Sequence, residues 1–353
     1  MNPTALLELM LEDMENADVL YRPTNFWQSG LSDIVNDLRK QGFDNFRSHK
    51  SANSFYVPIY TDEKLYPLAR PFISLLRPFR FLQRIRRLEA IFNRALDGTT
   101  TAECHYKTFR GSLQSTELPW ADLSEGMVGS GDQYEFEGRH YSRSFLNYLL
   151  GLNFLQKNVN ANNVRTVLEI GGGYGTLGEI FLNSYSDSFY LDIDIPPVAA
   201  VASFYLSQTF GEDSVLTYER SREMQEIDIG ELRKKYRCAV LCPWQLPRLT
   251  GQADLFVNFI SFQEMEPNIV ENYIKHVQPL TRSFVLLRNS KHGKLQVKKE
   301  GQVGVFSQTT TDNLEKMFDQ FSLIDRNSLV YGERSPDGTF ESEVLCLRRS
   351  ISS

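Results

Sequence analysis

A short apolar run that passes into closely spaced glycines and then into a helix is the feature that most restricts the fold. Residues 167–181 read VLEIGGGYGTLGEIF. A strand that ends in glycines and opens a helix lets the backbone turn tightly and presents free N–H groups at the helix start. Such a unit buries its faces only when further strands and helices pack beside it. It therefore predicts an α/β domain with a ligand site at this turn.

Strands and helices alternate from residue 165 onward. Short apolar runs predict strands at 165–170, 188–195, 238–244, 254–261 and 283–289. Helical spacing predicts helices at 175–185, 196–211, 266–277 and 312–321. This order predicts a Rossmann-type doubly wound, mostly parallel sheet. Two β-like runs around a Pro-Asp-Gly turn within 328–350 predict an antiparallel C-terminal hairpin, which suits a methyltransferase sheet better than a typical NAD domain.

The first part of the chain has a different character. With 353 residues, the chain is long enough for two domains or for one domain with a large extension. We expect a mainly helical N-terminal region over 1–125 that caps a domain over 126–353. Helical spacing is present at 4–17, 28–41, 69–96 and 142–159, whereas 43–70 reads as irregular and 97–133 as polar and rich in turns.

The glycines fit two ligand patterns at once. Gly171, Gly173 and Gly175 follow Glu169 as E-x-G-x-G-x-G, which suits S-adenosylmethionine (SAM). Gly173, Gly175 and Gly178 read G-x-G-x-x-G, which suits a dinucleotide such as NAD. A carboxylate at Glu169 would hold the ammonium group of SAM, directly or through water, but would be repulsive or idle beside a pyrophosphate. Glu169 therefore favours SAM, and Gly178 is left to let its helix pack closely on the sheet.

A second acid is expected after the second strand, where it accepts hydrogen bonds from ribose hydroxyls. Asp192 and Asp194 alternate with apolar residues, so both side chains leave the strand on one face. Asp194 is nearer the carboxyl end of the strand, where ligands bind, and is the preferred residue. Capping of the helix that begins at Pro196 is the alternative role for this pair.

Three segments together resemble a known family. LEIGGGYGTLGEIF, FYLDIDIPPVAAVASFYLS and DLFVNFISFQEM are similar to the Rossmann-type, SAM-dependent sugar O-methyltransferase family of bacterial polysaccharide loci, over roughly 130–350. The resemblance implies SAM as cofactor, a hydroxyl of a sugar or glycan as acceptor, with a lipid-linked glycan as one option, and S-adenosylhomocysteine (SAH) as product.

The resemblance also implies a set of cofactor-binding residues. The third strand ends in CPWQLP instead of an acid, so the adenine contact would fall to Trp244 or Gln245. The complete expected set is Glu169, Gly171, Gly172, Gly173, Tyr174, Gly175, Asp194, Ile195, Gln245 and Ser261.

Methyl transfer to a hydroxyl requires alignment of the nucleophile and removal of its proton. In a doubly wound sheet, the reacting groups come from the carboxyl ends of the strands. Glu264 follows the fourth strand and His292 follows the fifth, while His140 precedes the helix that leads into the glycine segment. These three residues are the catalytic candidates. Alternatively, Glu264 is only an acid at the start of a helix, and His292 is only a histidine in a solvated loop. No compact cluster predicts a metal site.

The segment 69–96 carries seven arginines against one acid, beside a helical apolar stripe. Such a helix suits an anionic membrane surface, or else it packs on the cofactor domain with its arginines paired to acids. The net charge of −6 argues against nucleic acid as a partner of the whole chain. Without a signal-peptide pattern at the N-terminus, the expected location is the cytoplasm, with peripheral contact at the inner membrane face.

Four interpretations stay open at this stage. A SAM-dependent O-methyltransferase acting on a sugar is preferred, and a SAM methyltransferase acting on another small molecule or a protein is next. An NAD-dependent oxidoreductase is favoured by G-x-G-x-x-G alone. A non-catalytic, membrane-associated module that binds a nucleoside is the alternative outside the enzymes.

Overall fold

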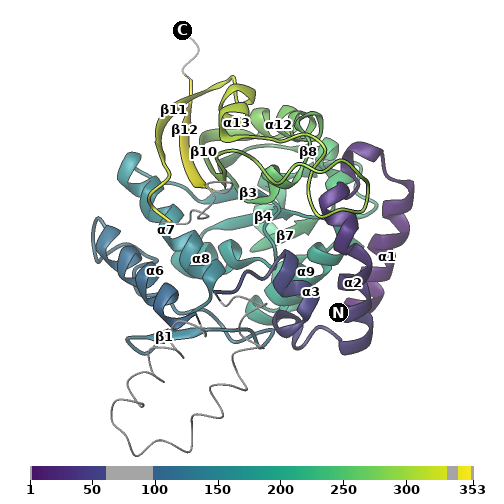
Figure 1. The fold of residues 1–353 in the computed structure, drawn as a ribbon, viewed down its shortest axis with the longest axis horizontal. Helices are drawn as coiled ribbons and strands as arrows, with labels where there is room; N and C mark the ends of the chain where they lie inside the picture. Colours follow the sequence, from purple (N-terminus) through teal and green to yellow (C-terminus); the bar gives the residue numbers. More distant parts are fainter. Residues whose placement is uncertain (1, 61–97, 332–340, 351–353) are drawn as a thin grey trace, which may run out of the picture.

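The computed structural model describes residues 2–60, 98–331 and 341–350. An eight-stranded sheet of order β11-β12-β10-β9-β3-β4-β7-β5 forms its centre (Figure 1). Six of its strands pair with one another in parallel: β3 (Thr166–Ile170), β4 (Phe189–Ile193), β5 (Val215–Leu216), β7 (Cys238–Leu241), β9 (Ala253–Phe259) and β10 (Thr281–Ser290).

The last two strands make the sheet mixed. β12 (Ser342–Arg349) lies between β10 and β11 (Phe321–Asn327) and is antiparallel to both. From β7 to β11 the order is that of a doubly wound dinucleotide fold, with one antiparallel strand inserted before the last. The expected Rossmann-type doubly wound sheet with antiparallel C-terminal strands is confirmed, but the first strand of that pair is Phe321–Asn327 and not the run that was expected to begin at 328.

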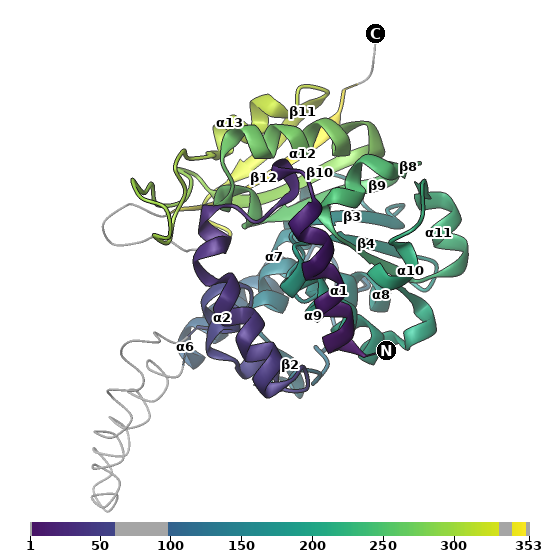
Figure 2. The same cartoon turned by 90° about the vertical axis from the view of Figure 1, so that its right-hand side faces the viewer.

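Helices cover both faces of the sheet, which is why its inner strands read as continuous apolar runs. The helices α7 (Arg143–Asn158), α8 (Thr176–Ser184) and α9 (Pro196–Phe210) share a core on one face. The helices α11 (Ile229–Lys235), α12 (Pro267–Leu280) and α13 (Thr311–Met317) share a core on the other. Figure 2 shows α12 and α13 opposite α7 and α9 across the sheet.

Short elements complete the α/β part. A hairpin of β1 (Tyr134–Phe136) and β2 (Arg139–Tyr141) precedes α7. The two-residue strands β6 (Ile227–Asp228) and β8 (Leu249–Thr250) pair in parallel, and α10 (Tyr218–Ser221) packs on α1.

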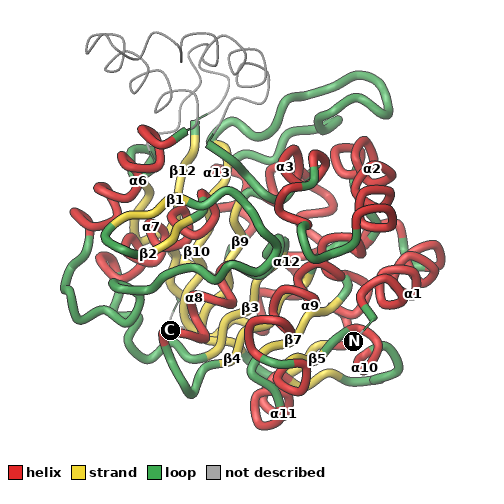
Figure 3. Tube along the Cα trace, turned by 90° about the horizontal axis from the view of Figure 1, so that it is seen from below, coloured by secondary structure: helices red, strands yellow, loops and turns green. Residues whose placement is uncertain are grey.

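The N-terminal region packs onto the sheet domain. Its helices α1 (Pro3–Asn16) and α2 (Asn25–Gln41) contact α9, α3 (Lys50–Phe55) contacts α2, and α6 (Thr99–Ser112) contacts α7 (Figure 3). One apolar core includes Leu7 and Phe46 from this region together with Tyr174 from the glycine segment. The boundary near residue 125 stays a prediction, because the two parts share that core.

Two local predictions were wrong. The stretch 97–133 is not uniformly irregular, because α6 occupies its beginning, with Ala102, His105, Tyr106 and Phe109 forming a short buried stripe. The helix expected over 312–321 ends at Met317, because the chain from Phe321 pairs with β12 as a strand.

The basic segment 69–96 and the Pro-Asp-Gly turn lie outside the described residues. Among the described residues, no helix is long and apolar enough to cross a membrane.

Replacing Gly178 by alanine should destabilise the fold by about 1–3 kcal/mol, because overpacking distorts a filled core. A Cβ at this position would lie 2.5 Å from Cδ1 of Tyr190 on β4. Urea unfolding monitored by circular dichroism measures the loss. Gly111→Ala in α6 is the matched control, since nothing lies within 4 Å of its added Cβ. It should leave stability unchanged or raise it by up to about 1 kcal/mol. Equal effects of the two changes would contradict close packing at Gly178.

Candidate functional site: a cavity at the carboxyl ends of the strands

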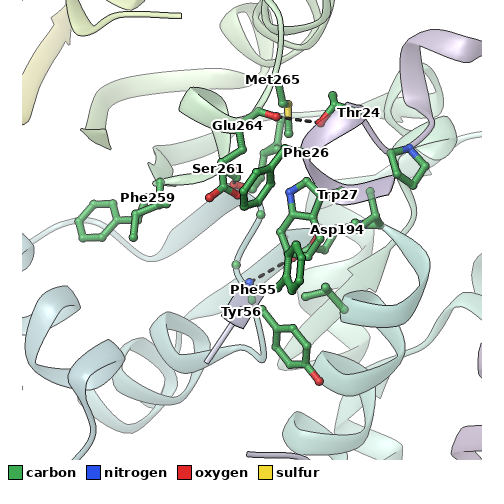
Figure 4. A pocket seen from close by; sticks show the side chains of 18 of the residues that line it. Thr24, Phe26, Trp27, Phe55, Tyr56, Asp194, Phe259, Ser261, Glu264 and Met265 are labelled. Carbon is green, nitrogen blue, oxygen red and sulfur yellow. Dashed lines mark hydrogen bonds between the residues drawn. The ribbon is translucent and has the colours of Figure 1, made fainter. Parts of the chain in front are cut away.

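A cavity of about 240 Å³ lies where the strand order reverses between β3 and β9. This is the position at which open α/β sheets bind ligands. The sheet domain provides the wall formed by the glycine loop, Asp194, Ser261 and Glu264. The N-terminal region provides the facing wall, and Figure 4 shows its labelled side chains: Thr24, Phe26, Trp27, Phe55 and Tyr56.

The glycine loop takes a backbone path that side chains would block. Gly171, Gly173 and Gly175 all have positive φ, at 74°, 64° and 96°. A Cβ on Gly171 would lie 2.3 Å from the Ser261 hydroxyl oxygen. At Gly173 the nearest atom to an added Cβ is the carbonyl oxygen of Tyr56, at 3.6 Å. Gly173 is therefore the glycine that borders open space in the cavity, while Gly175 serves as the N-cap of α8.

Asp192 in β4 and Asp194 just after it hold this loop through its amides. Asp192 Oδ1 accepts from the Gly172 N–H at 3.0 Å, and Asp194 Oδ2 accepts from the Gly173 N–H at 3.1 Å. Asp194 Oδ1 accepts from the Ile195 N–H at 2.7 Å. Burial and the neighbouring charge of Asp192 hold the pKa of Asp194 well above its ordinary value. Asp194 and Ile195 also line the cavity. The carboxylate of Asp194 therefore holds the glycine loop and borders the ligand space as well.

Glu169 lies behind the loop. Its two carboxylate oxygens accept hydrogen bonds from Tyr148 Oη at 2.8 Å and Tyr190 Oη at 2.6 Å, and the residue is fully buried. Burial, with a contribution from the charge of Asp192, raises the pKa of Glu169 to about 8. The expected direct contact between Glu169 and an ammonium group is therefore corrected: both oxygens of this side chain are occupied by tyrosine hydroxyls, and Glu169 is not among the residues that line the cavity.

Gln245 is also removed from the ligand space. Its Oε1 accepts from the Cys242 N–H at 2.8 Å, and its Nε2 donates to Ser221 Oγ at 3.0 Å. These bonds cap a short 3-10 helix, Pro243–Arg248, so the amide is used for structure. The neighbouring indole of Trp244 donates to Tyr218 Oη at 2.9 Å. The wall beyond Asp194 is instead apolar and aromatic: Ile195, Pro243, Ile269 and Tyr273.

Glu264 is the one catalytic candidate from the sequence that lines the cavity. Its side chain is buried and forms an ion pair with Lys294, with 3.0 Å between Oε1 and Nζ. Burial raises the pKa of Glu264, while the Lys294 ammonium and a hydrogen bond from Trp27 lower it. Lys294 Nζ also lies 4.2 Å from the ring centroid of Phe26. Thr24 Oγ1 donates to the backbone oxygen of Glu264 at 2.8 Å, which fixes the turn that carries the carboxylate.

Neither candidate histidine is in the cavity wall. His292 is exposed in the turn after β10, because that strand continues to Ser290 and carries the turn past the edge of the sheet. His140 lies in the β1–β2 hairpin, where its N–H donates to Ser124 Oγ at 2.9 Å. Both predictions of a histidine base are corrected by these positions.

Sequence reasoning missed Lys294 and the aromatic wall from the N-terminal region. Lys294 comes two residues after His292, and only the loop geometry distinguishes the two. The irregular stretch 43–70 is rich in aromatics, and this was the available signal for Phe55 and Tyr56. Nothing in the local pattern separates Phe26 and Trp27 from ordinary core residues of α2.

The turn after β9 contains a strained residue. Ile260 has φ 75° and ψ −38°, a conformation that is unusual for a β-branched side chain. Its N–H donates to the Arg288 carbonyl at 2.6 Å, and this hydrogen bond keeps Ile260 in the strained conformation. The turn directs Ser261 against the glycine loop, where its hydroxyl donates to the Ile170 carbonyl at 3.1 Å.

A buried ion pair connects the glycine loop to the N-terminal region. Arg47 Nη2 and Glu125 Oε1 are 2.7 Å apart, and both side chains are fully excluded from solvent. Tyr174 Oη donates to the same carboxylate oxygen at 3.0 Å, and the guanidinium of Arg47 lies 5.0 Å from the Tyr174 ring centroid. Burial raises the pKa of Tyr174 to about 12, so its phenol remains a donor. Tyr174 thus contributes to the cavity wall while its hydroxyl is anchored outside the loop.

Among the described residues, no three His, Cys, Asp or Glu side chains gather as metal ligands.

Comparison with known proteins gives similarity of fold at low identity. No protein-family model matches the sequence, and no curated protein matches it. Mitomycin 7-O-methyltransferase MmcR aligns over 92% of this chain and 68% of its own, with TM-score 0.37 and 11% identity. Magnesium protoporphyrin IX methyltransferase ChlM from Synechocystis PCC 6803 with bound SAM aligns over 60% of this chain and 86% of its own, with TM-score 0.37 and 13% identity.

The O-methyltransferase NcsB1 from neocarzinostatin biosynthesis, in complex with SAM and 2-hydroxy-5-methyl naphthoic acid, aligns over 59% of each chain, with TM-score 0.35 and 11% identity. Because these TM-scores are below 0.5, function has to be argued from the site itself.

Replacing Arg47 by methionine should destabilise the protein by about 3–5 kcal/mol, because Glu125 is left buried without its partner. Chemical unfolding at pH 7 measures the change. Arg39→Met is the matched control, since Arg39 pairs with Glu8 at 2.6 Å on an exposed surface. The control should leave the unfolding midpoint nearly unchanged. A small effect at Arg47, similar to that at Arg39, would refute an organising role for the buried pair.

Proposed function

We propose that the protein is a SAM-dependent O-methyltransferase. The observation that carries this proposal is the pairing of the Gly172 and Gly173 amides with Asp192 and Asp194. In a dinucleotide site, such loop amides face a pyrophosphate. Here the side chains of Asp192 and Asp194 already occupy these amides, so a pyrophosphate could not bind them, and a ligand with positive charge would favour the ionised form of Asp194. SAM carries both a sulfonium and an ammonium, whereas NAD would bring two phosphates to the same place.

The residues around the cavity fit the parts of this cofactor. The open side of Gly173 leaves room for the methionine part, and Asp194 can accept hydrogen bonds from ribose hydroxyls. Pro243, Ile269 and Tyr273 offer an apolar wall for the flat adenine ring. When bound, the cofactor supplies an electrophilic methyl group on sulfur. The inserted antiparallel strand β12 supports the same class, since a typical NAD domain lacks it.

Glu264 is the base in this proposal. Its carboxylate accepts the proton of the acceptor hydroxyl as the oxygen attacks the methyl carbon in line with the breaking C–S bond. Burial makes Glu264 a stronger proton acceptor than an exposed glutamate, whereas the ammonium of Lys294 favours its ionised form. The proton affinity of Glu264 therefore depends both on its burial and on the charge of Lys294.

The acceptor is proposed to be a hydroxyl of a sugar or glycan, on the basis of the sequence resemblance. Phe26, Trp27 and Phe55 present flat apolar surfaces on the acceptor side, beside the polar Glu264. Such rings can pack against the C–H faces of a sugar ring. The same wall favours a second candidate, an aromatic small molecule with a phenolic hydroxyl.

Calorimetry with SAH, SAM and NAD tests the cofactor. We expect SAH to bind and NAD to give no signal. Gly173→Val should abolish SAH binding by filling the open side of the loop, and Asp194→Ala should weaken it at least tenfold through loss of charged hydrogen bonds. Gly111→Ala, remote from the cavity, should bind SAH normally. Binding of NAD but not SAH, or normal SAH binding by Gly173→Val, would overturn the proposed site.

SAH release from SAM, measured with one panel of free and nucleotide-linked sugars and one of simple phenols, tests the acceptor and the base. Activity should rise as pH passes the pKa of Glu264, because only the ionised carboxylate accepts a proton. Lys294→Met removes a group that lowers this pKa, so the acidic limb of the profile should move to higher pH. Glu264→Gln should lower turnover at least about 100-fold and retain SAH binding. An unshifted profile in Lys294→Met would exclude Glu264 as the base.

A further inference from the structure

The amino group of a bound SAM needs hydrogen-bond acceptors close to the glycine loop. An ammonium carries three donors, and a buried donor without an acceptor is costly. Glu169, the acceptor expected from the sequence, is occupied by two tyrosine hydroxyls and lies outside the cavity wall. The fold must therefore provide another acceptor if the cofactor binds as proposed.

Asn147 on α7 has the properties of such an acceptor. It lines the cavity and its side chain is almost fully buried, with 3% of the residue exposed. Its Oδ1 is buried without a hydrogen-bond partner among the described residues. Buried polar atoms in native proteins are nearly always paired, so an unpaired oxygen on a residue that lines a cavity points to a ligand that supplies the donor.

Neighbouring contacts place Asn147 beside the glycine loop and hold it there. Ser144, Asn147 and Tyr148 follow helical spacing and all line the cavity. Tyr148 Oη donates to Glu169, two residues before Gly171, and its ring stacks on Phe259 with 4.8 Å between centroids. The helix backbone is fixed as well, since the Asn147 carbonyl accepts from Tyr331 Oη at 3.3 Å.

Two other residues of the cavity wall have unpaired buried oxygens, Asn53 and Tyr56. Both belong to the facing N-terminal wall. Figure 4 shows the Tyr56 hydroxyl directed away from Ser261 and Glu264. Burial, with a contribution from the charge of Asp37 in α2, raises the pKa of this hydroxyl. Asn53 is only half-buried in α3. Asn147 alone of the three comes from the helix that is bonded to the strand before the loop.

We infer that Asn147 Oδ1 accepts a hydrogen bond from the ammonium group of the methionine part of SAM. This inference rests on the proposed function. Glu169 then has an indirect role: it fixes Tyr148, and thereby this end of α7, against the sheet. The amino group is recognised by a neutral amide in a preformed position, and the carboxylate seen in the sequence motif lies behind it.

The test uses two ligands that differ at the amino-acid end. SAH carries the ammonium, whereas 5′-methylthioadenosine keeps the adenosine and the sulfur but lacks the amino acid. In calorimetry, Asn147→Ala should weaken SAH binding by about 10- to 100-fold, as expected for one hydrogen bond to a charged group. Binding of 5′-methylthioadenosine should stay within about twofold of the unmodified protein. Asn147→Asp should bind SAH at least as tightly as the unmodified protein, since it presents an anion to the ammonium.

Asn53→Ala is the matched control, because it removes another unpaired amide oxygen from the opposite wall. It should weaken SAH by less than about threefold. The inference is overturned if Asn147→Ala weakens both ligands equally, or if only Asn53→Ala discriminates between them. Should Asn147→Ala fail to fold, weaker SAH binding by Asn147→Asp would overturn it. Failure of the unmodified protein to bind SAH would overturn the proposed function itself, an outcome separate from these.

Discussion

The buried pair of Arg47 and Glu125 is the interaction on which the site depends. Both charges are fully withdrawn from water, and the favourable attraction offsets this desolvation only if the remaining donors and acceptors are also satisfied. The fold does so on the carboxylate, which also accepts from the Ser142 N–H and hydroxyl and from Tyr174 Oη. Residues from the N-terminal region, the start of α7 and the glycine loop are thereby held at one point. Loss of the Glu125 carboxylate would release all of these partners, and loss of Arg47 would leave that carboxylate buried without its counter-charge.

A second feature follows from the position of that loop. Glu169 in β3 lies beside Asp192 in β4, and Asp194 follows directly after β4; burial raises the pKa of each of the three. Their proximity makes it unfavourable to ionise all of them together, so some retain protons near neutral pH. A cationic ligand beside Asp194 would favour the ionised forms. Binding of such a ligand would therefore release protons, which links the charge state of the strands to occupancy of the cavity.

The sequence predicted the sheet well because its signals are local. The apolar runs and the glycines of 167–181 follow from short-range geometry, and they placed Gly173 and Asp194 at the cavity. The errors concern residues whose role depends on distant partners. Glu169 is hydrogen-bonded to Tyr148 and Tyr190, and Gln245 is hydrogen-bonded to Ser221. No residue spacing in the sequence predicts these contacts. For the same reason the N-terminal wall could not be predicted: Trp27 becomes part of the site only when α2 packs against α9.

The way α2 begins has a consequence for how the chain acquires its ligand during synthesis. Thr24 bonds to the carbonyl of Glu264, and Asn25 donates to the Gly304 carbonyl. Tyr21 likewise contacts His276, 255 residues further along the chain. Contacts between such distant residues form late and slow the folding of a chain. The start of α2 must therefore wait until about residue 304 has emerged from the ribosome before the cavity can close, and the growing chain would be unable to retain a ligand in the cavity before then.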